Sequence, residues 1–386
     1  MTLRANWNYP TAVRFGAGRV AELPDALAIA GIERPLLVTD PGITKLPMLD
    51  AVLTILKEAG KPAAVFSDVK PNPIESNVAA GVAAYKAGGH DGVVALGGGS
   101  ALDAGKVVAF MTGQKRPMWD FEDIGDWWTR ADPAGIAPVI AVPTTAGTGS
   151  EVGRAGVITN EKTHTKKVIF HPKMMPVVTI CDPELTLGLP PFLTAGTGMD
   201  ALAHCFEAYC APGYHPMAEG IAVEGMRLVK DFLPRAVRDG SDIEARAHMM
   251  SAAAMGATAF QKGLGAIHAM SHPVGALYDT HHGMTNAVFM PYVMAFNRKA
   301  ISDKMERLAA WLGLKKRNYK GVLHWVLELR EEIGVPHTLE AFKVDDGRLD
   351  QIARMAVVDP TAGGNPVKLT KGGAKKIFRH ALEGKV

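Results

Sequence analysis

The first half of the chain alternates short apolar runs with amphipathic segments, and this alternation constrains the fold more than any other feature. The segments between the runs have helical spacing and end at Gly or small residues. Strands separated by helices predict a parallel sheet with helices on both faces. The predicted strands are 34–40, 63–69, 91–96 and 137–142, and the predicted helices between them are 46–59, 75–87 and 101–111.

The pattern changes after Pro183, where Val- and Ile-rich runs become rare and long Ala-, Met- and Leu-rich segments follow one another. Apolar residues recur there with helical period, and Gly or Pro separates most segments. The second half is therefore predicted to be all-helical. The predicted helices are 192–211, 216–236, 241–258, 264–278, 285–298, 302–313 and 319–333, and residues 113–135 of the first half are predicted to be a long surface loop.

Composition restricts the class of function. The 386 residues are 47% hydrophobic and carry a net charge of +3 without basic clusters, which argues against nucleic acid or an anionic membrane as a partner. No apolar run approaches the ~20 residues that span a bilayer. Met1 to Pro10 contain no apolar segment of the kind that directs export. The three cysteines form no Cys-x-x-Cys pair, so a reducing, cytoplasmic location is expected.

Four candidate metal ligands lie between residues 200 and 282. Asp200 and His204 are four residues apart, so a helix would place both on one face. With His268 and His282 they form a set of one carboxylate and three imidazoles, which suits a divalent transition metal with an open position. The alternative is that these histidines are hydrogen-bonded core residues, and the spacing alone does not show that the segments meet.

A glycine-rich segment at 97–100 follows a predicted strand and opens a predicted helix. Backbone N–H groups at such a helix start favour an anion. The motif is weak by itself, because a tight turn would also explain it. Two further features favour a dinucleotide: Asp40 ends an earlier strand, where it could bind ribose hydroxyls and repel a 2′-phosphate, and the Gly/Thr-rich loop 144–150 follows another strand.

Together these segments resemble the iron-containing (group III) alcohol dehydrogenase family. The resemblance extends over nearly the whole chain, in order and at about the family spacing. The matching segments are 10–18, 97–106, 143–151, 198–204, 268–283 and 359–366.

The resemblance implies a Rossmann-like α/β dinucleotide-binding domain at 1–183, an all-helical metal-binding domain at 184–386, and an active site in the cleft between them. It implies a metal bound by Asp200, His204, His268 and His282, with Fe²⁺ expected and Zn²⁺ possible. His272 corresponds to the catalytic histidine beside the nicotinamide. The implied NAD contacts are Asp40, Asn72, Gly97, Gly98, Gly99, Ser100, Asp103, Thr144, Thr145 and Lys167, with Lys166 as a one-residue alternative to the last.

The chain departs from the family pattern near the expected substrate pocket. Gly153 replaces a threonine common in relatives, and the 260–265 segment matches no single branch. Arg154 could bind a substrate carboxylate or sulfonate, but a structural ion pair is the preferred interpretation. The expected pocket residues are Gly153, Arg154, Phe260 and Thr361.

The predicted function is a metal-dependent, NAD-linked alcohol dehydrogenase and aldehyde reductase, in which a hydride passes between the metal-bound substrate and the nicotinamide. NADP is less expected than NAD. The substrate is a small alcohol or aldehyde, and the family implies a homodimer or larger homo-oligomer. The alternatives are a polyol (glycerol-type) dehydrogenase, a maleylacetate-type reductase, or a nucleotide-binding protein that is not an enzyme.

Overall fold

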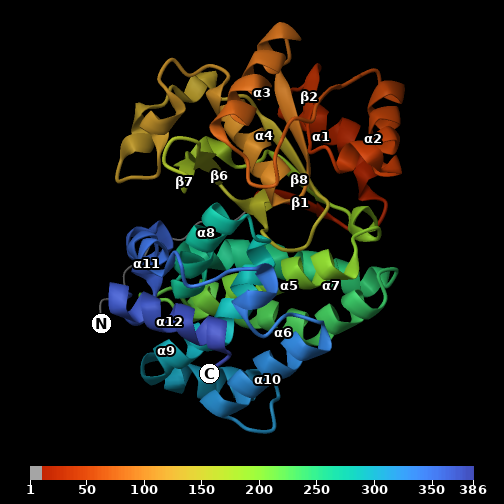
Figure 1. Cartoon of the computed structure of the whole chain (residues 1–386). Coiled ribbons are helices and arrows are strands. Elements are labelled where there is room, and N and C mark those ends of the chain that lie inside the picture. The colour runs from red at the N-terminus through yellow and green to blue at the C-terminus, as the bar shows by residue number, and fades with distance from the viewer. Residues whose placement is uncertain (1–10) are drawn as a thin grey trace. The chain divides into compact units, whose positions relative to one another are not determined.

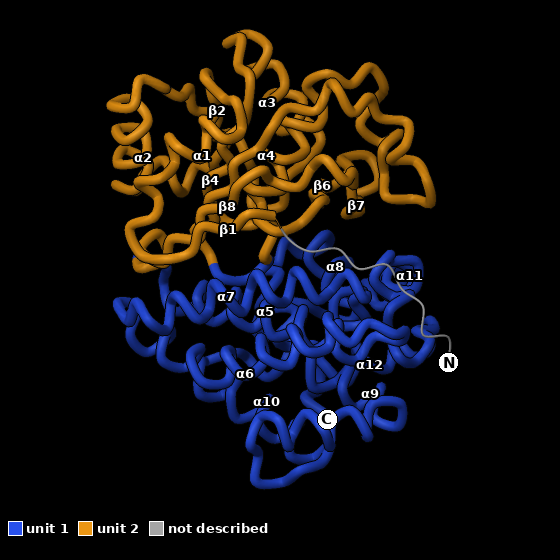
Figure 2. The backbone as a smooth tube through the Cα atoms, turned by 180° about the vertical axis from the view of Figure 1, so that it is seen from behind, with its two compact units in different colours: residues 1–8, 146–148, 188–386 blue, residues 9–145, 149–187 orange. Residues whose placement is uncertain are grey.

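The computed structural model describes residues 11–386, and its backbone contacts divide the chain into two compact units (Figure 2). Unit 2 contains residues 11–145 and Gly149–Leu187. Unit 1 contains Ala146–Thr148 and Gly188–Val386. The domain boundary predicted after residue 183 lies close to the end of unit 2. The expectation that the N-terminus lacks an export segment concerns Met1–Pro10, which lie outside the described residues.

Unit 2 is built on a six-stranded parallel sheet, which confirms the predicted fold class for this half of the chain. Four of the strands were predicted. The two that were not predicted are β1, whose side chains are mostly exposed, and β8. In spatial order the strands are β1 (Ala12–Phe15), β8 (Val178–Cys181), β5 (Val139–Pro143), β4 (Gly92–Gly97), β2 (Pro35–Val38) and β3 (Ala64–Phe66).

Helices cover both faces of this sheet, because successive strand residues point to opposite sides. On one face Leu37 and Val94 pack in a core with α1 (Leu23–Ala30) and α2 (Pro47–Glu58). On the other face the neighbouring residues Leu36 and Val93 pack in a second core with α4 (Gly99–Met111), which α3 (Glu75–Ala87) adjoins; these helices can be followed in Figure 1. All of these strand residues are buried, as expected for a parallel sheet covered on both sides.

A two-stranded antiparallel sheet of β6 (Ala155–Asn160) and β7 (Thr165–Phe170) was not predicted. The predicted surface loop 113–135 contains three short 3₁₀ turns, at Met118–Phe121, Trp127–Arg130 and Pro133–Gly135. Its tryptophans pack the segment down: Trp119 Nε1 donates to Glu75 Oε2 (2.8 Å), and Trp128 lies edge-on to Phe170.

Unit 1 is helical throughout, as predicted. The helices are α5 (Pro191–Cys210), α6 (Pro216–Arg238), α7 (Ile243–Ala259), α8 (Ala266–Tyr278), α9 (His282–Trp311), α10 (Tyr319–Glu332), α11 (Leu349–Val358) and α12 (Lys371–Glu383). The two helices predicted at 285–298 and 302–313 are wrong as separate elements, because α9 runs through both. Residues 298–301 contain neither Gly nor Pro, and Arg, Lys and Ala are good helix formers. Within the described residues, none of the helices is long and apolar enough to cross a membrane.

Candidate active site

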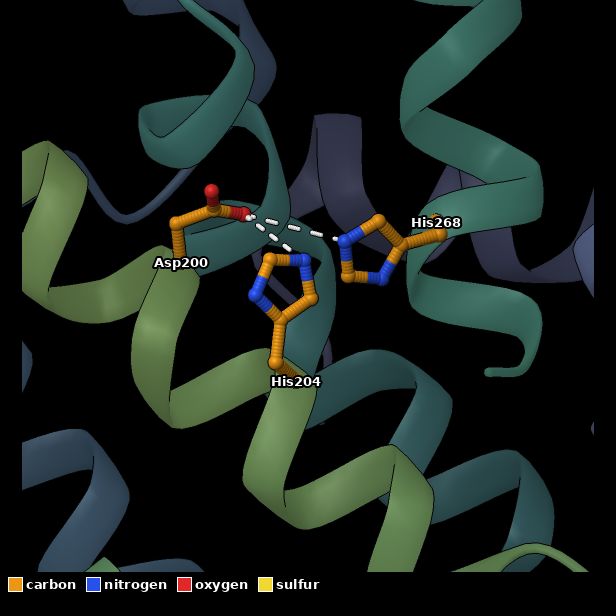
Figure 3. Close-up of side chains that lie close together, drawn as sticks. All are labelled: Asp200, His204 and His268. Carbon is orange, nitrogen blue, oxygen red and sulfur yellow. Dashed lines mark ion pairs between the residues drawn. The ribbon is translucent and has the colours of Figure 1, made fainter. Parts of the chain in front are cut away.

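Helix α5 presents the first two candidate ligands on one face. Asp200 and His204 are one turn apart, and Asp200 Oδ1 lies 3.8 Å from His204 Nε2. His268 approaches from α8, with its Nε2 atom 3.7 Å from the same oxygen (Figure 3). All three side chains are buried. Helix α5 and helix α8 therefore meet around one carboxylate oxygen, which the spacing in the sequence could not show.

The fourth candidate, His282, is the first residue of α9, and its Nε2 atom lies 3.6 Å from Asp200 Oδ1. Gly283 allows this approach, because a Cβ atom there would lie 2.1 Å from the carbonyl oxygen of Gly196 on α5. His281 caps α9 by accepting from the Met284 backbone N–H (3.3 Å).

Three of the four side chains fit a metal ion: Asp200, His204 and His268 each offer one ligand atom, and these atoms lie within 4.8 Å of one another. His282 Nε2 lies near Asp200 Oδ1, and its role as the fourth ligand stays a prediction. Ligand atoms at 2.0–2.2 Å from a tetrahedral ion lie about 3.4 Å from one another, close to the 3.6–3.8 Å between Asp200 Oδ1 and the three imidazole nitrogens. One oxygen and three nitrogens are donors that iron and zinc both accept. This donor set is the observation on which the metal assignment depends.

The carboxylates of the site stabilise a positive charge among the histidines. Burial alone would raise the pKa of Asp200, but the three facing histidines hold it well below its usual range. Burial lowers the pKa of His204 to about 4, so this imidazole is neutral with a free ring-nitrogen lone pair. Burial by itself would lower the pKa of His268, but the carboxylates of Glu207 and Asp200 raise the pKa of this imidazole to about 9. With no metal, a proton on His268 therefore supplies the positive charge that the carboxylates attract.

Asn286 was not identified from the sequence. Its Nδ2 atom donates to Asp200 Oδ1 (2.8 Å) and lies 3.2 Å from the Nε2 atoms of both His268 and His282. Its Oδ1 atom is buried and has no hydrogen-bond partner among residues 11–386. Asn286 lies four residues after His282, one helical turn along the same face, and that spacing would have indicated it.

Glu207 was also missed, although it lies on the face of α5 that carries Asp200 and His204. Its Oε2 atom is 2.5 Å from His268 Nδ1, and its Oε1 atom accepts from the Ile267 backbone N–H (2.6 Å). Glu207 therefore contacts the metal site through His268. Its place three residues after His204 is the sequence pattern that could have revealed it.

The predicted catalytic residue His272 lies next to the metal ligands within unit 1. Its ring is stacked on that of His282, with centroids 5.4 Å apart and planes 16° from parallel. Its Nδ1 atom lies 2.9 Å from Asp359 Oδ2. The other oxygen of Asp359 accepts from the backbone N–H (2.9 Å) and the hydroxyl (2.6 Å) of Thr361, which was assigned to the substrate pocket. Thr361 thus orients Asp359, and Asp359 orients His272.

In unit 2 the glycine-rich segment 97–100 and the first residues of the loop 144–150 follow neighbouring strands at their carboxyl ends. Gly97 at the end of β4 pairs with Pro143 at the end of β5, and Thr144 N donates to Gly97 O (3.0 Å). Gly97 has a φ of +145°, and a Cβ atom there would lie 2.8 Å from the Ala101 Cβ atom. Only glycine fits this conformation without strain.

Glycine at positions 97 and 98 leaves space that a side chain would fill. A Cβ atom on Gly98 would come within 3.3 Å of Thr145 Cγ2, and one on Gly97 within 3.3 Å of Asp40 Oδ2. The loops are therefore narrow enough for a ligand to approach the backbone directly. Thr39 Oγ1 is buried beside Gly97 and has no hydrogen-bond partner within the part of the chain that the structure describes. Gly99 begins α4, so the N–H groups of Gly99 and the following residues open a helix.

Other predicted cofactor residues make contacts of their own. Asp40 Oδ1 accepts from the backbone N–H groups of Gly42 (2.7 Å) and Ile43 (3.2 Å), which leaves its second oxygen facing Gly97. Ser100 Oγ donates to Pro71 O, one residue before the predicted Asn72. Lys167 on β7 pairs with Glu122 Oε2 (2.5 Å).

Asp103 has a structural role in unit 2. It accepts from the Ser150 hydroxyl and, through Oδ2, from the Val157 backbone N–H (2.9 Å). Lys106, fully buried one turn along α4, donates to the carbonyl oxygens of Ser150 (2.9 Å) and Ala155. These contacts hold the segment that follows the second loop against α4. A cofactor contact of Asp103 stays a prediction.

The remaining predicted pocket residues occupy different surroundings. Phe260 lies edge-on to the ring of His204, with centroids 5.1 Å apart. The guanidinium of Arg154 lies over the ring of Phe170 at 5.3 Å, a cation–π contact. Burial raises the pKa of Asp123 and the charge of Arg154 opposes this shift, so the preferred ion-pair interpretation of Arg154 stays a prediction. Gly153 precedes it, close to the buried Lys106.

Glu151→Gln is expected to remove part of the pH dependence of stability. Burial raises the pKa of this carboxyl from 4.5 to about 7, although Lys106 opposes the shift. The native state then holds the proton more tightly than the unfolded chain, so the free energy of unfolding falls as pH rises from 4.5 to 7, by about 3 kcal/mol. Urea unfolding at pH 5 and pH 8 should show this loss in the wild type and a smaller loss in the variant. Equal losses in both proteins would contradict the assignment.

The comparisons with known proteins agree with this geometry. The family model "Iron-containing alcohol dehydrogenase" matches residues 10–183, and "Fe-containing alcohol dehydrogenase family, C-terminal" matches residues 194–382. The chain is 38% identical over 385 residues to the 4-hydroxybutyrate dehydrogenase of Cupriavidus necator, covering 97% of this chain and 99% of that protein.

Two solved structures show the same fold. The structure of a 1,3-propanediol oxidoreductase superposes with a TM-score of 0.93 at 35% identity, covering 98% of this chain and all of that one. The sulfoacetaldehyde reductase of Bifidobacterium kashiwanohense in complex with NAD⁺ gives a TM-score of 0.88 at 29% identity, covering 98% and 99%. Because the family models together match most of the chain and the relatives match along their whole length, the predicted family is confirmed: the chain belongs to the iron-containing alcohol dehydrogenase family of oxidoreductases.

Proposed function

We propose that this protein is a metal-dependent, NAD(H)-linked alcohol dehydrogenase that also reduces the corresponding aldehyde or ketone. The observation that carries the proposal is the convergence of three imidazole nitrogens on Asp200 Oδ1 at 3.6–3.8 Å. A divalent metal bound there would supply Lewis-acid activation of the substrate oxygen. Iron is the metal expected from the family, and zinc suits the same donors.

The exposure of the ligands suggests where the substrate binds. Asp200, His204 and His268 are 4%, 3% and 2% exposed, whereas the side chain of His282 is 28% exposed. The substrate oxygen would therefore approach on the side of His282. His272 lies on that side, because its ring is stacked on that of His282.

His272 is suited to accept the proton of the alcohol. An ionised Asp359 can only accept, so it holds the proton of His272 on Nδ1 and leaves Nε2 as the nitrogen that would take the hydroxyl proton. A base held in one tautomer at the substrate side can take the hydroxyl proton while the hydride leaves the carbon. In the reducing direction the same atom would return the proton.

NAD is the preferred cofactor. The free oxygen of Asp40 faces Gly97, where a carboxylate would accept from ribose hydroxyls and repel a 2′-phosphate. The structural neighbour that was solved with NAD⁺ supports the same choice. Asn72, Ser100, Thr144, Thr145 and Lys167 remain proposed contacts of this cofactor.

A polyol dehydrogenase is the second candidate, because a 1,3-propanediol oxidoreductase is among the similar structures. The four-ligand set speaks against a metal-free maleylacetate-type reductase. The paired loops and complete ligand set also speak against a nucleotide-binding protein without catalysis.

A spectrophotometric assay tests the function. After metal analysis, the protein would be given primary alcohols, diols and hydroxy acids with NAD or NADP, and reduction would be followed at 340 nm. We expect turnover with NAD that exceeds turnover with NADP, and loss of activity after chelation. Equal activity of the stripped protein, or no dinucleotide reduction with any alcohol, would contradict the proposal.

Two further features belong to this proposal. The three cysteines, Cys181, Cys205 and Cys210, are free and buried, which is consistent with a reducing cytoplasmic compartment. The homodimer or larger homo-oligomer expected from the family would be measured by light scattering.

A further inference from the structure

We infer that Glu207 is a positioning residue of the metal site, which holds the His268 imidazole in the tautomer and orientation that a metal requires. The inference rests on the proposed metal site but not on the alcohol chemistry. It concerns a residue that touches neither the metal position nor the substrate directly.

The sequence of α5 brings the three residues together. Asp200, His204 and Glu207 are separated by four and three residues, so they form one stripe along the helix. The first two face the metal position directly. Glu207 faces His268 on α8, with 2.5 Å between its Oε2 atom and Nδ1 of the ring. The same helix therefore supplies two ligands and the partner of a third.

Both oxygens of Glu207 already have donors. Oε1 accepts from the Ile267 backbone N–H at 2.6 Å, and Oε2 accepts from His268. Gly265 leaves room for the carboxylate, because a Cβ atom there would lie 3.0 Å from Oε1. Glu207 is 4% exposed, so water cannot replace either contact. The Ile267 N–H at the start of α8 holds the Glu207 carboxylate in place, and the carboxylate holds the His268 ring in place.

The chemistry of the pair decides the tautomer. An ionised carboxylate only accepts, so Nδ1 of His268 must carry the proton. The lone pair of Nε2 is then available on the side of Asp200, where the metal would bind. Carboxylates that accept from ligand histidines in this way orient the ring and increase its basicity.

A simpler alternative is that Glu207 only caps α8 through Ile267. Glu207→Gln distinguishes the two roles, because glutamine has one oxygen where two acceptors are needed. If that oxygen stays on Ile267, the amide N–H₂ faces Nδ1 and forces the proton onto Nε2, against the metal. If it moves to His268, the Ile267 N–H loses its partner and only stability suffers.

The experiment measures metal affinity and thermal stability of the full-length protein. Zinc affinity would be determined by competition with a chromophoric chelator, and melting would be followed in the metal-free state. We expect Glu207→Gln to weaken zinc binding by about 10–100-fold. Glu207→Leu is measured beside it, because leucine leaves no acceptor for either His268 or Ile267. Zinc affinity of Glu207→Leu within twofold of the wild type, together with a lower melting temperature, would overturn the inference and leave a capping role.

Two controls separate general damage from loss of positioning. Glu219→Gln alters another carboxylate of unit 1, which pairs with Lys262 and Lys304 (2.8 Å each) and not with a histidine. Asn365→Ala removes the acceptor of the Ala266 N–H (3.1 Å) at the same helix start. Both should keep wild-type zinc affinity. Equal weakening in Glu207→Gln and both controls would overturn the inference.

A spectroscopic measurement covers the case in which the variant does not fold. In the zinc-loaded wild type, the ring ¹⁵N resonances of His268 should show a proton on Nδ1 that exchanges slowly with water. A deprotonated Nδ1 would overturn the inference. A protein that binds zinc as described but oxidises no alcohol would contradict the proposed function and leave this role of Glu207 intact.

Discussion

His268→Ala should remove the metal and alcohol oxidation together, while dinucleotide binding stays within about twofold of the wild type. The imidazole is 2% exposed, and its Nε2 atom lies 3.7 Å from Asp200 Oδ1, so no water-exposed group can take its place. Loss of a hydrogen-bonded supporting residue costs about 10–100-fold in affinity or activity, and loss of a direct ligand should cost more. The predicted cofactor loops, 97–100 and 144–145, belong to unit 2, whereas His268 belongs to unit 1. The substitution should therefore leave these loops intact.

Metal content would be measured by mass spectrometry, and NADH binding by fluorescence titration. His248→Ala is the matched control, because His248 lies on α7 and stacks on Phe232, with ring centroids 3.9 Å apart. The control should keep both metal and turnover. A His268→Ala protein that retained either would contradict the ligand assignment.

His272→Ala should lower kcat by about 10²–10⁴-fold, the usual contribution of a positioned general acid or base, with metal content unchanged. The ring is stacked on His282, and its Nδ1–H donates to Asp359. Asp359→Asn should act in the same direction. An amide that donates to Nδ1 would place the ring proton on Nε2, so the ring could not accept the proton of the alcohol.

Steady-state kinetics and metal analysis would test this pair. Thr361→Val is the control: it removes the hydroxyl that donates to Asp359 Oδ1 at 2.6 Å but keeps the backbone N–H at 2.9 Å, so its effect on kcat should be small. If His272→Ala changed only KM and left kcat within threefold, the residue would position the nicotinamide and not move the proton.

Much of the fold could be predicted from local patterns. Strands β2 to β5 could be predicted because each lies in a short apolar run bounded by Gly, Pro or an acidic residue. The antiparallel pair β6 and β7 was not predicted: eight of its twelve side chains are only partly buried, and β7 begins with the polar residues Thr165, Lys166 and Lys167. The continuity of α9 through residues 298–301 could have been predicted, since these residues contain neither Gly nor Pro.

The site was predictable only in part. The spacing of Asp200 and His204 placed both on one helix face, but their meeting with His268 and His282 depends on tertiary contacts such as Gly283 against Gly196. The family resemblance supplied that association. Glu207 and Asn286 were recoverable from helical spacing to known ligands. Asp359 was not, because 87 residues separate it from His272.

Diffraction from crystals of the active protein, collected at the iron and zinc absorption edges, tests the central claim most directly. The account predicts one anomalous peak at about 2.0–2.2 Å from a carboxylate oxygen of Asp200 and from the Nε2 atoms of His204, His268 and His282. Fully active crystals with no peak at that position, or with the metal bound elsewhere, would contradict it.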